Sequence, residues 1–253
     1  MNRGISISQL AKQIEDAQAR QKDLLVPTNN MSMMAVAKHP VIDIEGHAFV
    51  EPTDWAHAQL GQHLGIPKTY YDKLRNEDHL DLLTENVNHW MEKDNSTRLV
   101  RLDGTDMRAI LSDRYKRIDH PVVLRESLEA LTDIHDVKIL SSEVTAKKMY
   151  IKALFPNITG EVRDGDTIHP GVYISNSEVG GGSFEVTGFF YRDFCENGCV
   201  FGRQDVAQAV RRRHTGGKLQ MADGYGIWQD DTLAAEAQML AKQARDVVKA
   251  FSN

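Results

Sequence analysis

The sequence predicts an α+β protein in which helices and strands occupy separate parts of the chain. Apolar residues recur at three- and four-residue spacing through most of residues 1–95. Short strand-like runs divided by glycine-containing turns then fill the stretch from Thr97 to about Lys218, and helical spacing returns from Asp231. Because strands and helices come in blocks and do not alternate regularly, an α+β fold is favoured over an α/β fold.

We expect residues 1–95 to form a mainly helical N-terminal region and residues 96–253 to form a β-rich core that includes a long C-terminal helix. A chain of 253 residues is long enough for one large domain, or for one domain with a helical extension. We find no internal repeat and no low-complexity linker between the two parts. They are therefore expected to form one compact unit.

The N-terminal region contains four predicted helices and one predicted hairpin. The first helix covers residues 6–25, where Ser6 or Ser8 can cap the start and Pro27 stops it. A hairpin around Glu45-Gly46 follows at residues 41–50. The other three helices are one that is capped by Thr53 and ended by Gly65, one that starts at Pro67, and one with an apolar stripe from Leu80 to Trp90.

The β-rich core begins with two strands around the Asp103-Gly104 turn, followed by a helix from about Pro121. Later strand-like runs, punctuated by glycines, cover residues 137–140, 148–155, 171–175, 183–191 and 200–203. One face of the expected C-terminal helix is lined by Leu233, Ala237, Leu240, Ala244, Val247 and Phe251.

The composition is that of an ordinary globular protein. Hydrophobic residues make up 41% of the chain and charged residues 26%, which argues against wholesale disorder. No apolar run approaches the roughly 18 residues of a membrane-spanning helix, and the N-terminus lacks the apolar stretch of a signal peptide. Two cysteines do not make a disulfide framework. We therefore expect a protein of the cytoplasm.

Basic residues are concentrated in two islands, although the net charge of the chain is −6. The first island contains Arg98, Arg101 and Arg108, with aspartates among them. The second contains Arg203, Arg211, Arg212, Arg213, His214 and Lys218. For the first island we favour solvated faces with internal ion pairs. For the second, three consecutive arginines leave two interpretations open, a phosphate site or cations at the end of a helix.

Three further groups of residues could bind a ligand or take part in catalysis. The turn Gly180-Gly181-Gly182 could cradle a phosphate or simply form a tight hairpin, and its spacing differs from that of a P-loop. Cys195 and Cys199 flank a short loop and are interpreted as structural, because a zinc site would need two more ligands. Glu178, Cys195 and His214 could serve an enzyme, but no spacing marks them as a unit. No metal or other cofactor is expected, and the catalytic residues are unknown.

Five strings of the sequence are specific enough to indicate a family. They are Gly61–Tyr70, Arg108–Tyr115, Pro170–Gly180, Cys195–Gly198 and Arg212–Gly216. In this order they resemble the phage/plasmid-like protein family, which is catalogued as a domain of unknown function and occurs in phages, prophages and plasmids. The resemblance spans about Leu60 to Gly217. It implies a mobile-element protein of the bacterial cytoplasm and supplies no activity.

A fold-level analogy leads one step further. Phage single-strand annealing proteins share a curled antiparallel sheet backed by a helix, with basic residues lining a groove. The order of hairpin, helix, sheet and arginine cluster in this chain is similar. The analogy implies a curled antiparallel sheet with packed helices, a homo-oligomer, and single-stranded DNA held by both basic islands. Base stacking would come from Tyr173, Phe189, Phe190 or Tyr191.

Three hypotheses on function stay open. The leading one is a phage or plasmid DNA-metabolism protein that binds single-stranded DNA and anneals it during recombination. The second is an enzyme with a site near Glu178, Cys195 and His214, which we favour less. The third is a non-catalytic interaction protein, such as an inhibitor of a host factor, whose acidic outer helices would meet a basic partner.

Overall fold

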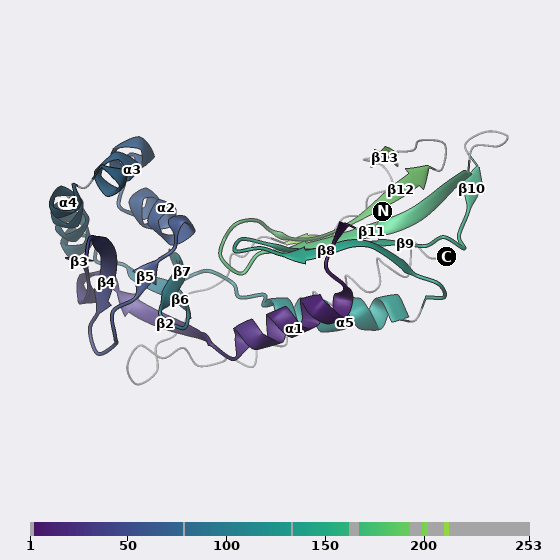
Figure 1. The fold of residues 1–253 in the computed structure, drawn as a ribbon, viewed down its shortest axis with the longest axis horizontal. Coiled ribbons are helices and arrows are strands. Elements are labelled where there is room, and N and C mark those ends of the chain that lie inside the picture. Colours follow the sequence, from purple (N-terminus) through teal and green to yellow (C-terminus); the bar gives the residue numbers. More distant parts are fainter. Residues whose placement is uncertain are drawn as a thin grey trace. The chain divides into compact units, whose positions relative to one another are not determined.

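A computed structural model describes residues 3–77, 79–132, 134–161, 167–192, 199–201 and 210–212 (Figure 1). For Arg3, Glu161, Arg192 and the last two ranges, only the backbone is described. These residues form five α-helices and three sheets, none of which is closed, so the expected mixture of helices and strands is confirmed. No helix in this part of the chain is long and apolar enough to cross a membrane. The predicted C-terminal helix lies outside the described residues.

The described chain divides into two compact units. Unit 1 contains residues 3–18 and 116–212, and unit 2 contains residues 19–115. The boundary predicted at residue 96 falls inside unit 2. The reason is that strand β6 (Thr97–Asp103) pairs along its whole length with strand β2 (Gln21–Pro27), which joins it to the N-terminal part of the chain.

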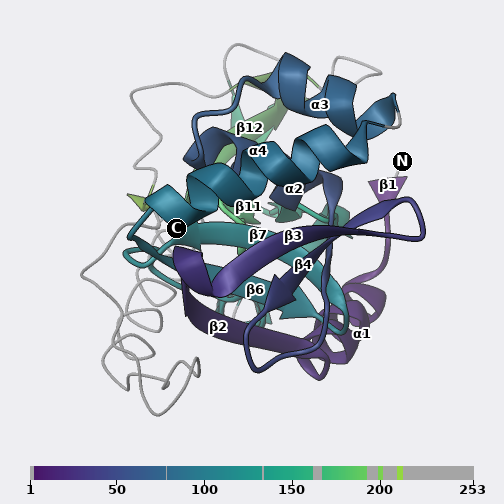
Figure 2. The ribbon, with the colours of Figure 1, turned by 90° about the vertical axis from the view of Figure 1, so that its left-hand side faces the viewer.

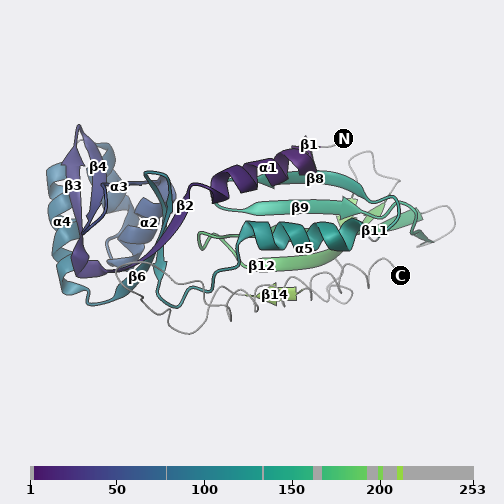
Figure 3. The ribbon, with the colours of Figure 1, turned by 90° about the horizontal axis from the view of Figure 1, so that it is seen from below.

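Unit 1 is an open sheet with helices α1 (Ile7–Gln18) and α5 (His120–Thr132) side by side on one face (Figures 1 and 3). The strand order is β1-β8-β9-β11-β12-β13, with β10 on β11 and β14 on β12. Pairing is antiparallel except between β1 and β8. The strands are β1 (Arg3–Gly4), β8 (Lys138–Val144), β9 (Met149–Leu154), β10 (Gly160–Glu161), β11 (Thr167–Asn176), β12 (Phe184–Arg192), β13 (Cys199–Phe201) and β14 (Val210–Arg212).

The core of unit 1 lies between the two helices and one face of the sheet. Every second residue of the central strands enters this core, as the pleat of a strand requires. The core contains Leu10 and Ile14 of α1, Val123 and Leu124 of α5, and Met149, Ile151, Ala153, Val172, Ile174 and Val186 of the sheet.

The start of the chain is bound to β8 by backbone and side-chain hydrogen bonds. The amide of Ile5 donates to the carbonyl of Ser142 (3.0 Å), and the Ser142 hydroxyl donates to the carbonyl of Ile5 (2.7 Å). Ser6 then caps α1 in a reciprocal capping box with Gln9, which decides between the two predicted caps. The helix ends at Gln18, earlier than predicted.

Unit 2 contains a four-stranded sheet, a separate hairpin and three helices (Figure 2). The sheet has the order β2-β6-β7-β5, and the hairpin is formed by β3 and β4, against which α4 packs. A 3-10 turn, Thr28–Asn30, links β2 to β3. The remaining elements are β3 (Met31–Val36), β4 (His39–Ile44), β5 (Glu51–Pro52), α2 (Asp54–His63), α3 (Lys68–Asn76), α4 (Leu80–Lys93) and β7 (Asp106–Ser112).

The helix signals in unit 2 are confirmed, and the predicted hairpin is largely wrong. The Thr53 hydroxyl accepts a hydrogen bond from the Ala56 amide (3.2 Å), and Gly65 takes a φ of +69° after α2. Residues 41–50 share only one bridge, between Ile42 and Val50. The actual hairpin joins β3 to β4 through Ala37 and Lys38, with φ of +49° and +67°. Neither residue is the asparagine or glycine that signals such a turn.

Candidate functional site

The sheet face of unit 1 that lies opposite α1 and α5 gathers tyrosines and a lysine. Tyr150 and Lys152 alternate along β9 with core residues, so they point away from the helices. Cross-strand register places Tyr173 of β11 opposite Lys152. The register also places Phe189 and Tyr191 of β12 opposite residues of β11 that lie on the same side of the sheet as Tyr173. We call these five residues the tyrosine face. Neither described helix of unit 1 packs on it (Figures 1 and 3).

Two tyrosines of this face stack on each other. The rings of Tyr150 and Tyr173 have centroids 6.3 Å apart and planes inclined by 27°. The Tyr150 hydroxyl donates to the Glu143 carboxylate of β8, and this bond raises the pKa of the phenol. Tyr150 therefore remains protonated at neutral pH, and its ring is held in place by a bond at its outer end. Both rings are half-buried, so part of each is open to a ligand.

Lys152 and Phe189 form a second contact on the same face. The ammonium of Lys152 lies 4.8 Å from the centre of the Phe189 ring, and burial lowers the pKa of this lysine. Across the strand pair stands Gly171, where a Cβ atom would come within 2.4 Å of the Phe189 ring. The ring thus occupies the space that a side chain at position 171 would need.

The predicted stacking residues differ in burial. Phe189 is only 4% exposed, and its ring lies close against Gly171. Phe190 alternates onto the helix-facing side of β12, opposite Pro170. Tyr173 and Tyr191 are half-buried on the tyrosine face, as stacking would require. Tyr150 and Lys152 were missed, although the alternation of residues 149–152 contains the signal.

The predicted basic residues of the first island are parts of the four-stranded sheet of unit 2. Arg101 is only 3% exposed, and its Nε donates to Asp23 Oδ1 (2.8 Å). Arg98 donates to Asp94 Oδ2 (2.9 Å) and lies 3.3 Å from His63 Nδ1. Arg108 is half-buried in β7. Arg98 and Arg101 thus neutralise carboxylates of their own unit, as expected for internal ion pairs.

The second island is described only in part. Arg211 and Arg212 belong to β14, where they pair in register with Glu185 and Phe184 at the edge of β12. The backbone at this point is a strand and not the helix end that the sequence indicated. The remaining members of the island, Arg203, Arg213, His214 and Lys218, lie outside the described residues, and so does Cys195.

Glu178 has a structural contact in the glycine-rich loop that follows β11. Its buried carboxylate accepts a hydrogen bond of 2.6 Å from the backbone amide of His120, the first residue of α5. A carboxylate at this position satisfies a free amide and the positive end of the helix. The contact therefore joins the loop to α5, which is a sufficient reason for a buried glutamate here.

The same loop is fixed by two neighbouring side chains. Asn176 Nδ2 donates to the Ile118 carbonyl (2.7 Å) and lies 3.0 Å from His120 Nδ1. Because the carbonyl can only accept, the amide orientation is set, and His120 Nδ1 must be the acceptor. The Ser177 hydroxyl donates to the Lys147 carbonyl (2.7 Å) and accepts from the Gly181 amide (2.8 Å). The glycine turn is thus a packed connection between β11 and β12.

The described part of the chain contains no cluster of side chains suited to bind a metal ion. No group of three or more histidine, cysteine, aspartate or glutamate side chains is arranged there to hold an ion. The tyrosine face remains the place where predicted functional residues meet in one described surface.

Comparisons with known proteins give a family and no activity. A family model described as "Domain of unknown function (DUF932)" matches residues 108–243, more than half of the chain. The matched region begins in β7 and includes α5 and the strands of the tyrosine face. No curated protein matches the chain. No solved structure matches it either.

Proposed function

Because the chain belongs to the family described as a domain of unknown function (DUF932), its function has to be argued from its surfaces, and we propose that the tyrosine face binds single-stranded DNA. The observation that carries this proposal is the register of β9, β11 and β12. It brings Tyr150, Tyr173 and Tyr191, which are separated in sequence, onto one face beside Lys152.

The chemistry of this face suits unpaired bases. Half-buried tyrosine rings on a rigid sheet offer flat surfaces on which bases stack, a contact worth about 1–3 kcal/mol per base in such proteins. Stacking of this kind tolerates any sequence, because every base has an aromatic face. Lys152 adds a cation on the same surface, and the backbone of Arg211 and Arg212 runs along the edge of the sheet. A strand crossing the face would meet the tyrosine rings and the Lys152 cation on one surface.

We propose that the protein anneals single strands as a homo-oligomer in phage or plasmid DNA metabolism. The support is an open, mainly antiparallel sheet whose described helices, α1 and α5, lie on one face, the arrangement that motivates the analogy with annealing proteins.

The first experiment measures binding of a fluorescent single-stranded oligonucleotide by anisotropy over a range of salt concentrations. We expect the affinity to fall steeply as salt rises, because bound phosphates release counterions. Tyr173→Ala should weaken binding about tenfold, the effect of one lost stacked base. The matched control is Tyr70→Ala, which removes a tyrosine of α3 that is 43% exposed and lies in unit 2.

Three results would contradict the proposal. The first is an absence of oligonucleotide binding by the wild-type protein even at low salt. The second is an equal loss of affinity in the Tyr173 and Tyr70 variants, because the tyrosine face would then have no special part in binding. Tighter binding of duplex than of single strands would also count against a stacking surface.

A further inference from the structure

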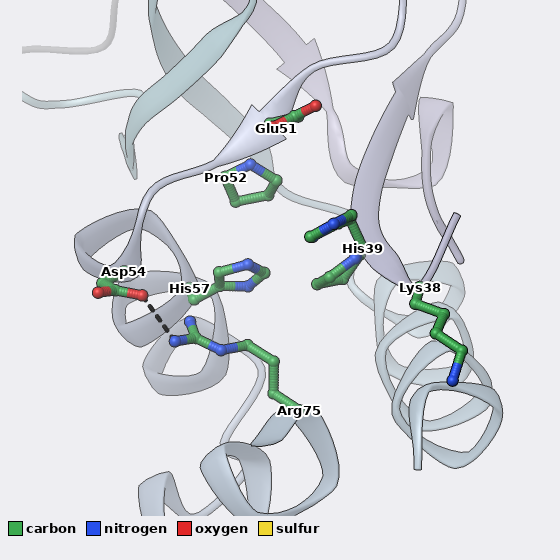
Figure 4. A pocket seen from close by; sticks show the side chains of 8 residues that line it. Lys38, His39, Glu51, Pro52, Asp54, His57 and Arg75 are labelled. Atoms are coloured by element: carbon green, nitrogen blue, oxygen red, sulfur yellow. Dashed lines mark hydrogen bonds and ion pairs between the residues drawn. The ribbon is translucent and has the colours of Figure 1, made fainter. Parts of the chain in front are cut away.

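Unit 2 contains a pocket of about 260 Å³ between β4, β5 and helices α2 and α3 (Figure 4). The side chains of His39, Pro52, His57 and Arg75 face one another around it. Lys38 and Glu51 also line the pocket, but their charged ends point away from these four residues (Figure 4). The centre of the pocket is therefore surrounded by two imidazoles, a guanidinium and a proline ring. The carboxylate of Asp54, which is paired with that guanidinium, also lines the pocket.

His57 presents a hydrogen-bond donor to this pocket. The side chain is 4% exposed, and its Nδ1 lies 2.8 Å from the hydroxyl of the buried Tyr71. Burial raises the pKa of Tyr71, so the phenol keeps its proton, and no other acceptor for that proton is seen among the described residues. Tyr71 therefore donates to Nδ1, and the proton of the neutral imidazole resides on Nε2. Within the described part of the chain Nε2 has no hydrogen-bond partner.

Arg75 supplies a fixed cation beside this donor. Its Nη2 donates to Asp54 Oδ1 (2.6 Å), and the arginine side chain is 21% exposed while that of Asp54 is 90% exposed. The hydrogen bond from Arg75 lowers the pKa of Asp54, so the pair persists over a wide pH range. No other hydrogen bond links Arg75 to a described residue. Its remaining N–H groups are thus available to an acceptor in the pocket.

Donors come from three elements on three sides of the same space. His57 belongs to α2, Arg75 to α3, and the exposed His39 begins β4. A tetrahedral oxyanion with three terminal oxygens matches this arrangement better than a planar carboxylate, which offers two oxygens in one plane. Guanidinium and imidazole N–H groups are also the donors that bind phosphate strongly.

We propose that this pocket binds a terminal phosphate group, a phosphomonoester, with its oxygens on Arg75, His57 and His39. The pocket is larger than a phosphate ion, and the ring of Pro52 offers an apolar surface to the group that carries the phosphate. The phosphate could belong to a small metabolite or to the 5′ end of a strand, since the recognised chemistry is the same. This site lies in unit 2 and stands independently of the tyrosine face.

The test uses the full chain and nuclear magnetic resonance of the histidine ring nitrogens, with the His57 signal identified by its loss in His57→Gln. Inorganic phosphate should shift the His57 Nε2 signal and bind with a dissociation constant of about 1 mM, in keeping with a few charge-assisted hydrogen bonds. A nucleoside 5′-monophosphate that binds more tightly than a 5′-phosphorylated oligonucleotide would assign the site to small molecules. The reverse order, with no binding of the 5′-hydroxyl oligonucleotide, would assign it to strand ends. No shift with phosphate, or equal binding of acetate, overturns the proposal.

Substitutions distinguish phosphate binding in the pocket from a general effect of surface charge. Arg75→Gln should weaken phosphate binding about tenfold. The matched control is Arg20→Gln, because Arg20 also pairs with a carboxylate of unit 2, Asp103 (2.8 Å), but does not line the pocket. His39→Gln changes an exposed ring and should weaken binding without loss of thermal stability. Unchanged affinity in both Arg75→Gln and His39→Gln contradicts the assignment.

Discussion

Two arginines in the four-stranded sheet of unit 2, Arg98 and Arg101, pair with carboxylates of the same unit, whereas the lysine on the tyrosine face of unit 1 lies over an aromatic ring. Arg101 is buried against Asp23, and Arg98 donates to Asp94. Lys152, in contrast, lies 4.8 Å from the centre of the Phe189 ring, beside two half-buried tyrosines. A cluster of arginines in a sequence is therefore a weaker guide to an anion site than the partner of each arginine in the fold.

The largest effect is expected from Arg101→Met, which tests whether the first basic island is structural. Removal of one partner leaves the Asp23 carboxylate largely buried without this ion pair, and breaking a buried pair costs about 3–5 kcal/mol of unfolding free energy. The measurement is urea unfolding followed by circular dichroism. Adding Asp23→Leu should recover much of the loss, because the pair is then replaced by apolar side chains.

A different behaviour of the Arg101 variant would contradict a purely structural role for this arginine. Normal stability combined with weaker oligonucleotide binding would mean that Arg101 contacts nucleic acid. The control for unfolding is Arg20→Gln, which removes a more exposed pair and should cost at most about 1 kcal/mol.

A smaller effect is expected from acid, because unit 2 also keeps a histidine neutral. Burial, helped by the charge of Arg75 and opposed by Asp54 and Asp72, lowers the pKa of His57 from 6.5 to about 4. Below about pH 6.5 the unfolded chain binds a proton at this position that the folded chain excludes. Stability should therefore fall as the pH decreases toward 4, by roughly 3 kcal/mol in total for this residue.

The measurement is the difference in unfolding free energy between wild type and His57→Gln at about pH 7 and about pH 4.5. The variant should be the less stable protein at neutral pH and should lose part of that disadvantage in acid. A difference that stays constant over this range would show that His57 takes up its proton in both states.

The smallest effect is expected on the tyrosine face itself. Gly171→Ala places a methyl group where the Phe189 ring and the Ala153 carbonyl are within 2.4 and 2.6 Å, so both the ring and the backbone have to shift. Such overpacking costs about 1–3 kcal/mol. Thermal unfolding measures this loss, and Phe189→Leu in the same chain should relieve part of it. If Gly171→Ala is neutral and the double variant is less stable, the ring does not pack on this glycine.

The ion pair between Asp23 and Arg101 shows why the partner of a predicted ion pair could not be identified from the sequence. Asp23 and Arg101 stand directly opposite each other in the register of β2 and β6. Residues 6–25 carry apolar side chains at helical spacing, so the sequence predicts a helix that includes Asp23. A helix at this position does not indicate that Asp23 pairs with Arg101. The four-stranded sheet overrides that spacing by burying Leu24, Leu25 and Val26. Contacts between residues this far apart depend on register, which local patterns do not contain.

Other parts of the fold were predictable because their signals are local. Thr53, Gly65 and the Asp103-Gly104 turn act within a few residues, and each marks the boundary that the structure has. For the site, Tyr173 and Tyr191 could be named from aromatic residues in strands. Their meeting with Tyr150 needs the pairing of three strands, and the burial of Phe189 needs Gly171 on the neighbouring strand.

The pairing of β1 with β8 has a consequence for synthesis of the chain. Ile5 is bonded to Ser142, 137 positions later, while the described residues of unit 2 form the continuous stretch 19–115 between them. At about 5–20 residues per second, the first strand waits on the order of ten seconds for its partner to be translated. Residues 19–115 are all translated during that interval. This stretch of unit 2 therefore leaves the ribosome first, and unit 1 can close around its own beginning only afterwards.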